Sequence, residues 1–175
     1  MLIHSKCLAG AVAFMTVAIS SPTEAHPLDR FEGPHWGMSM EQVQSAFGGR
    51  LVPFTPPGDS TSSKFGFPHY DVDDCNFFVD FKFENERLAR IDLVLISDSM
   101  DAAGCPTKIA EILTARYGVP VIDEPSKGMY SQDHERVWID GTTKISEFSF
   151  FFPTFNRTIL NLVYTPAWIP GAGKL

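Results

Sequence analysis

The chain has 175 residues, of which 21 are acidic and 14 basic, so its formal net charge is −7. A chain of this length can fold as one domain with a sizeable hydrophobic core. The acidic balance and the lack of any basic run argue against nucleic acid or an anionic membrane surface as a partner.

The first 25 residues have the pattern of an export signal. A short basic segment, 1–6, precedes an apolar run, 7–19, that is too short to span a bilayer comfortably. Small residues lie before a cleavage position after Ala25, so the mature chain is expected to begin at His26. We expect a soluble periplasmic or secreted protein without a membrane anchor, with a single domain at 26–170 and a tail at 171–175.

Two regions have the periodicity of amphipathic helices. Ser39 is placed to cap the first, at 39–47, and Gln42 completes a capping box three residues later. The second helix is expected at 106–117, where apolar residues recur at helical spacing. These residues are Ile109, Ile112, Leu113 and Tyr117.

Alternating apolar residues predict about six strands. They are expected at 65–72, 75–83, 87–96, 135–139, 142–152 and 157–165, with a further short strand at 51–54. Segments 55–64 and 123–133 are polar or rich in Pro, Gly and Ser, and we expect loops there.

The two halves of the chain resemble each other. Phe81 and Ile91 match Phe150 and Leu160 at an offset of 69 residues (150 − 81 = 69). The prediction is an α+β fold: an antiparallel sheet of about six strands with two helices on one face, built from a duplicated helix-plus-three-strand unit.

Two cysteines remain in the expected mature chain, Cys75 and Cys105. An even count in an exported chain predicts a disulfide. A hairpin centred near Asn85 would place both cysteines at the same end of the sheet. A redox pair would usually have C-x-x-C spacing, which is absent.

The aromatic residues exceed what one sheet face must bury. If the 142–152 strand points Phe150 toward the helices, several aromatic side chains should point away from them and form a binding surface. The candidates are Phe78, Phe151, Phe155, Trp138 and Trp168. A face covered by the loops and the C-terminal tail is an equal alternative.

No catalytic motif for hydrolysis and no nucleotide-binding fingerprint occurs in the sequence. We therefore expect no enzymatic activity and no cofactor. An N-terminal His26 could offer its amine and ring nitrogen to copper, with His35, His69 or His134 as a second ligand. A small-ligand or copper-binding protein is the alternative function.

Trp36-Gly37-Met38-Ser39, followed by Val43 and by Tyr117-Gly118-Val119-Pro120, resembles a group of small exported bacterial proteins. The pattern is also similar to the small lipoproteins of the outer-membrane β-barrel assembly machine and to the β-lactamase-inhibitor-protein-like fold. Unlike those lipoproteins, this chain has no cysteine placed for lipidation. The resemblance implies a non-enzymatic envelope protein that acts by binding another envelope protein.

Overall fold

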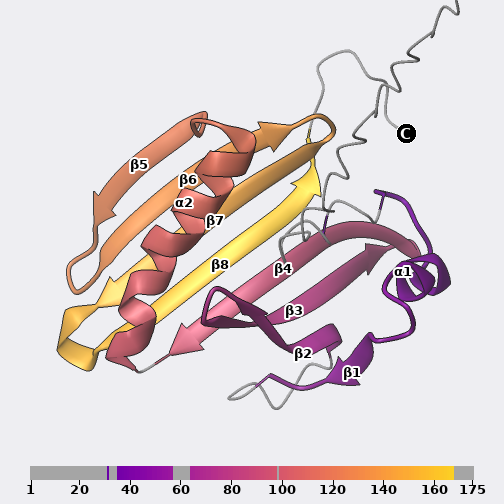
Figure 1. The fold of residues 1–175 in the computed structure, drawn as a ribbon, viewed down its shortest axis with the longest axis horizontal. Helices are drawn as coiled ribbons and strands as arrows, with labels where there is room; N and C mark the ends of the chain where they lie inside the picture. Colours follow the sequence, from indigo (N-terminus) through magenta and orange to yellow (C-terminus); the bar gives the residue numbers. More distant parts are fainter. Residues whose placement is uncertain (1–30, 32–34, 57–63, 98, 168–175) are drawn as a thin grey trace, which may run out of the picture.

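A computed structural model describes residues 31, 35–56, 64–97 and 99–167. Within them, two α-helices, α1 (Met40–Ala46) and α2 (Cys105–Tyr117), lie on one face of an eight-stranded antiparallel sheet (Figure 1). The α+β class, the antiparallel sheet and the two helices are confirmed. The prediction of about six strands is wrong by two.

The strands lie in the order β1-β2-β3-β4-β8-β7-β6-β5. Their bounds are β1 (Val52–Phe54), β2 (Lys64–Val72), β3 (Cys75–Glu84), β4 (Arg87–Ser97), β5 (Ile122–Lys127), β6 (Gln132–Asp140), β7 (Thr143–Phe152) and β8 (Arg157–Pro166). A helix followed by four consecutive antiparallel strands therefore occurs twice, and the two units join through their last strands, β4 and β8. Each unit has one strand more than the predicted helix-plus-three-strand unit.

The unexpected strand in the second unit is β5, which lies within the predicted polar loop 123–133. It pairs with β6 in continuous register from Ile122 opposite Val137 to Lys127 opposite Gln132. β5 is an edge strand, so its polar side chains can face solvent while its backbone pairs on one side. Composition alone therefore predicted a loop.

The junction between the units is symmetric. Leu93 of β4 pairs with Leu162 of β8, which follows it by 69 residues (162 − 93 = 69). Ile91 pairs with Tyr164 and Leu95 with Leu160, so the offset of 69 exchanges these two pairs. An approximate twofold axis between the strands has this property, because each surface then contacts its own equivalent.

Both helices bury their apolar residues in one core. The ring of Phe47, which follows α1, lies 5.6 Å from that of Phe67 and 5.1 Å from that of Phe81. Ile109 and Leu113 of α2 are fully buried in the same cluster. At the start of α1 the predicted capping box is present, because Ser39 and Gln42 each accept a hydrogen bond from the other's backbone amide.

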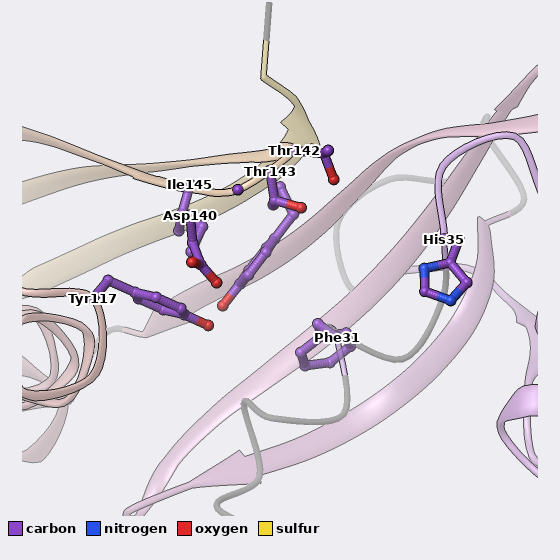
Figure 2. A pocket seen from close by; sticks show the side chains of 9 residues that line it. Phe31, His35, Tyr117, Asp140, Thr142, Thr143 and Ile145 are labelled. Atoms are coloured by element: carbon purple, nitrogen blue, oxygen red, sulfur yellow. The ribbon is translucent and has the colours of Figure 1, made fainter. Parts of the chain in front are cut away.

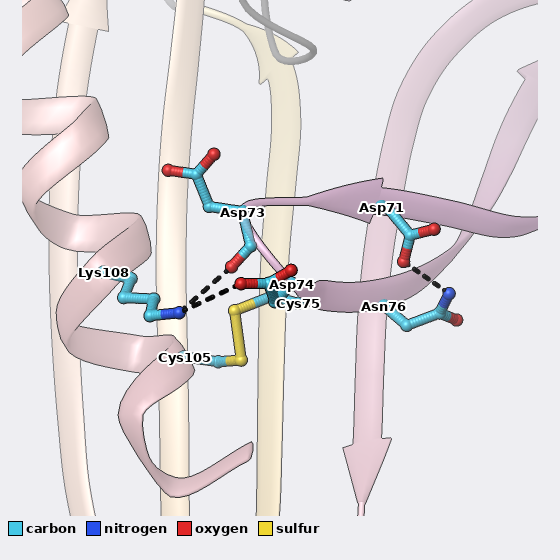
Figure 3. Close-up of a disulfide and its surroundings, with 7 residues drawn as sticks. All are labelled: Asp71, Asp73, Asp74, Cys75, Asn76, Cys105 and Lys108. Atoms are coloured by element: carbon cyan, nitrogen blue, oxygen red, sulfur yellow. Dashed lines mark hydrogen bonds and ion pairs between the residues drawn. A yellow bond between two sulfur atoms is a disulfide. The ribbon is translucent and has the colours of Figure 1, made fainter. Parts of the chain in front are cut away.

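A disulfide between Cys75 and Cys105 ties the first residue of α2 to the first residue of β3 (Figure 3), which confirms the predicted bond. Both cysteines are buried. Next to them, Lys108 Nζ donates to the Asp73 carbonyl at 3.2 Å and lies 3.8 Å from an Asp74 carboxylate oxygen. The disulfide and this lysine fix α2 to the turn between β2 and β3.

Between β7 and β8, a short 3-10 turn, η3 (Pro153–Phe155), closes the hairpin. A second one, η2 (Met100–Gly104), leads from β4 into α2.

Candidate functional site on the open face of the sheet

The sheet has a second face, and among the described residues neither helix lies on it. We call it the open face. An apolar patch occupies its centre, and its members come from the four adjacent strands β3, β4, β8 and β7. They are Phe78, Val94, Ile96, Ile159, Phe148, Phe150 and Phe152.

Strand register makes the apolar patch continuous. One row across the sheet runs from Phe78 to Val94, Asn161 and Phe148, and the next contains Ile96, Ile159 and Phe150. Ile96 is 47% exposed, and the other six members are half-buried. A contiguous apolar surface of this kind is typical of a protein-binding site.

At one edge the apolar patch is hollowed. Phe152, Phe155, Arg157 and Ile159 line a depression of about 610 Å³. Phe155, in the η3 turn, is 68% exposed. A depression with apolar walls and one guanidinium at its rim can accept a single large side chain from a partner.

Acidic side chains border the patch along β6. Asp133 pairs with Phe150 in the register and Glu135 pairs with Phe148. Neither forms an ion pair with any described residue. On the opposite side, the buried carboxylates of Asp80 and Asp92 are neutralised by lysine and arginine side chains. These ion pairs are Lys64–Asp80, Lys82–Asp92 and Arg90–Asp92.

The predicted surface residues are only partly brought together here. Phe78 lies in the apolar patch and Phe155 at its edge. Phe151 does not, because its register partner Thr158 is on the face toward the helices. The expectation that Phe150 and Phe152 face the helices is wrong, and with Phe148 they supply the aromatic part of the open face.

Two tryptophans were also expected on this surface. Trp138 is only 1% exposed and lies in the core opposite Ile145, where its indole N–H donates to the Gly118 carbonyl at 3.1 Å. The end of α2 covers it, so Trp138 is a core residue and the prediction is wrong. Trp168 lies outside the described residues.

The alternation of β7 is reversed because polar groups, not phenylalanines, fill its positions beneath α2. Glu147 is fully buried there, and both of its carboxylate oxygens accept from Arg136 Nη1 of β6, at 3.0 and 3.1 Å. Arg136 also donates to Asp123 of β5 at 3.2 Å and lies 3.2 Å from His134 Nδ1. His134 Nε2 lies 2.5 Å from Asp123 Oδ1.

This network sets the protonation of its members. The arginine beside Nδ1 of His134 favours the tautomer that donates from Nε2 to Asp123. That hydrogen bond holds the pKa of Asp123 below its ordinary value. Burial raises the pKa of Glu147, and Arg136 offsets only part of the rise. The network joins three strands and fills the space beneath α2.

A pocket of about 280 Å³ lies on the helix side, where the segment before α1 meets the second unit (Figure 2). Its lining includes Phe31, Tyr117, Asp140, Thr143, Ile145 and Tyr164. Trp36 braces it, because its indole N–H donates to Thr143 Oγ1 at 3.1 Å.

The histidines considered for copper lie in different settings. His35 lines this pocket, His69 Nδ1 lies 3.5 Å from Asn76 Oδ1, and His134 contacts Asp123. His26 lies outside the described residues. Among the described residues, no three His, Cys, Asp or Glu side chains are grouped as metal ligands would be.

No protein-family model matches this chain, and no curated protein is significantly similar to it. None of the helices in the described part of the chain is long and apolar enough to cross a membrane.

Proposed function

We propose that this is an exported, non-enzymatic protein that binds another envelope protein through the open face of its sheet. The observation that carries the proposal is the apolar patch, whose seven side chains adjoin across four strands. Burial of such a surface against a partner is favourable, at about 25 cal/mol per Å² of apolar area. Aromatic side chains at its centre are the residue type that dominates binding energy at interfaces.

Charge favours a different protein over a second copy of the chain. Each copy carries a formal net charge of −7, so two copies repel each other. The unpaired Asp133 and Glu135 along β6 would meet basic side chains most favourably. The expected partner therefore presents an apolar segment flanked by lysine or arginine, with one large side chain in the depression beside Phe155.

Paired variants test this proposal. Phe150→Ser removes the centre of the apolar patch, while Val119→Ser changes a residue that is 83% exposed and lies outside the patch. Affinity capture from the envelope fraction of the native cells should recover the same partner with the wild type and Val119→Ser. Recovery should fall at least tenfold with Phe150→Ser, provided that circular dichroism shows an unchanged fold.

Equal recovery by all three proteins would contradict the proposal. Sedimentation of the purified protein provides the second check, because a wild-type dimer that Phe150→Ser converts to a monomer would identify the occupant as a second copy.

A further inference from the structure

We infer that the pocket between Phe31 and Tyr117 binds a small protonated amine with a short apolar chain. The inference is independent of the proposed protein interface, since the pocket lies on the helix side of the sheet. Its volume, about 280 Å³, is just below the range of about 300–1,000 Å³ typical of small-molecule pockets. The ligand must therefore be small.

The floor of the pocket is apolar. Phe31 and Ile145 are 3% and 1% exposed, so their side chains belong to the core and present a rigid surface. The Phe31 ring is held by its neighbours, with ring centres 5.2 Å from Tyr70 and 5.8 Å from Tyr164. A floor of this kind accommodates a short alkyl group without rearrangement.

The mouth of the pocket is polar and negative. Asp140, at the end of β6, is the one carboxylate in the lining, and no lysine or arginine lines it. Figure 2 shows the Asp140 carboxylate and the Tyr117 hydroxyl directed toward the same space, with Phe31 and His35 across from them. A carboxylate attracts a cation and repels an anion, and its charge-assisted hydrogen bonds to N–H groups are strong.

Aromatic character at the mouth favours an ammonium group further. A cation near a tyrosine ring is attracted by the electron-rich face of that ring. The ring of Tyr117 already takes part in such a contact, because the Arg116 guanidinium lies 5.6 Å from its centre. The ammonium group would lie beside Asp140 and Tyr117, with its alkyl chain directed toward Phe31 and Ile145.

Three matched probes test the inference by nuclear magnetic resonance: n-butylammonium, n-butanol and butyrate, each titrated into the oxidised protein. Butylammonium should shift the resonances of Tyr117, Asp140 and Ile145 in a saturable manner, butanol should bind more weakly, and butyrate should not bind. Asp140→Asn keeps the shape of the turn and should weaken butylammonium binding about 10- to 100-fold.

Two variants separate binding from folding. Tyr117→Phe removes only the hydroxyl and should weaken butylammonium binding by a smaller factor. Asp101→Asn changes an exposed carboxylate in η2, outside the pocket, and should leave the affinity unchanged. Equal binding of butyrate and butylammonium, an unchanged affinity in Asp140→Asn, or shifts confined to other residues would overturn the inference.

Discussion

Glu147 and Arg136 form an ion pair beneath α2, with one guanidinium nitrogen donating to both carboxylate oxygens at 3.0 and 3.1 Å. Glu147 is fully buried and the Arg136 side chain is 18% exposed. Loss of one partner from such a pair typically costs about 3–5 kcal/mol, because it leaves a buried charge without compensation. This pair decides which way the β7 side chains point.

Arg136→Ala should therefore destabilise the fold by about 3 kcal/mol at neutral pH. The cost should shrink in acid. Glu147 has a raised pKa in the folded state, so the folded chain holds its proton more tightly than the unfolded chain. Stability consequently falls as pH rises from the unfolded value through the folded pKa. Loss of Arg136 raises that pKa further and enlarges the effect.

Urea denaturation at pH 4.5 and pH 7.5 measures this difference. The control is Arg136→Ala combined with Glu147→Gln, which removes the titrating carboxyl and should lose the additional pH dependence. An Arg136→Ala protein that is destabilised equally at both pH values would contradict the assignment.

His134→Ala should raise the pKa of Asp123 toward its ordinary value. The hydrogen bond from His134 is the largest cause of the depressed pKa, and Arg136 contributes less. A carboxylate with a depressed folded pKa stabilises the fold above its unfolded pKa, and this contribution is lost as pH falls through the folded pKa. Titration of the Asp123 carboxyl by nuclear magnetic resonance reports the shift directly; an unchanged pKa would show that the arginine dominates instead.

Removal of the disulfide should cost about 3–4 kcal/mol. Cys75 and Cys105 are 30 residues apart, and a closed loop of that length restricts the unfolded chain by about this amount in the chain-entropy estimate. The Cys75→Ala, Cys105→Ala double variant, compared with the oxidised wild type in urea, measures the difference. Equal midpoints and slopes for the two proteins would contradict a stabilising bond.

Gly66→Ala should destabilise the first unit. A Cβ atom at Gly66 would lie 2.0 Å from the backbone carbonyl oxygen of Val79 on the neighbouring strand, so β2 and β3 would have to move apart. Overpacking of this kind costs roughly 1–3 kcal/mol or more. Gly104→Ala is the matched control, because a Cβ atom there meets nothing within 4 Å. Similar thermal midpoints for the two variants would contradict the close approach.

Much of the architecture could be predicted from local patterns in the sequence. Ser39 and Gln42 predicted the start of α1 to within one residue, because a capping box depends on neighbouring residues alone. The cysteines could be paired because the hairpin register places them at one end of the sheet. These features depend on short-range geometry, which spacing in the sequence records directly.

The candidate site was harder to predict because it depends on long-range pairing. In β7, residues 147, 149 and 151 alternate with residues 148, 150 and 152, and the apolar set was assigned to the core. Glu147 is buried instead, because Arg136 on another strand neutralises it. Pairing at this sequence distance leaves no local signal, and a charged residue in a strand is normally assigned to solvent.

Photo-crosslinking in intact cells tests the central proposal, that the open face binds another envelope protein, most directly. A photoreactive phenylalanine analogue would replace Phe150 or Ile96 within the apolar patch, and Val119 as the exposed control outside it. The account predicts adducts with one and the same envelope protein from both patch positions and none from position 119. Absence of adducts from the patch, equal adducts from all three positions, or adducts only with a second copy of this chain would contradict it.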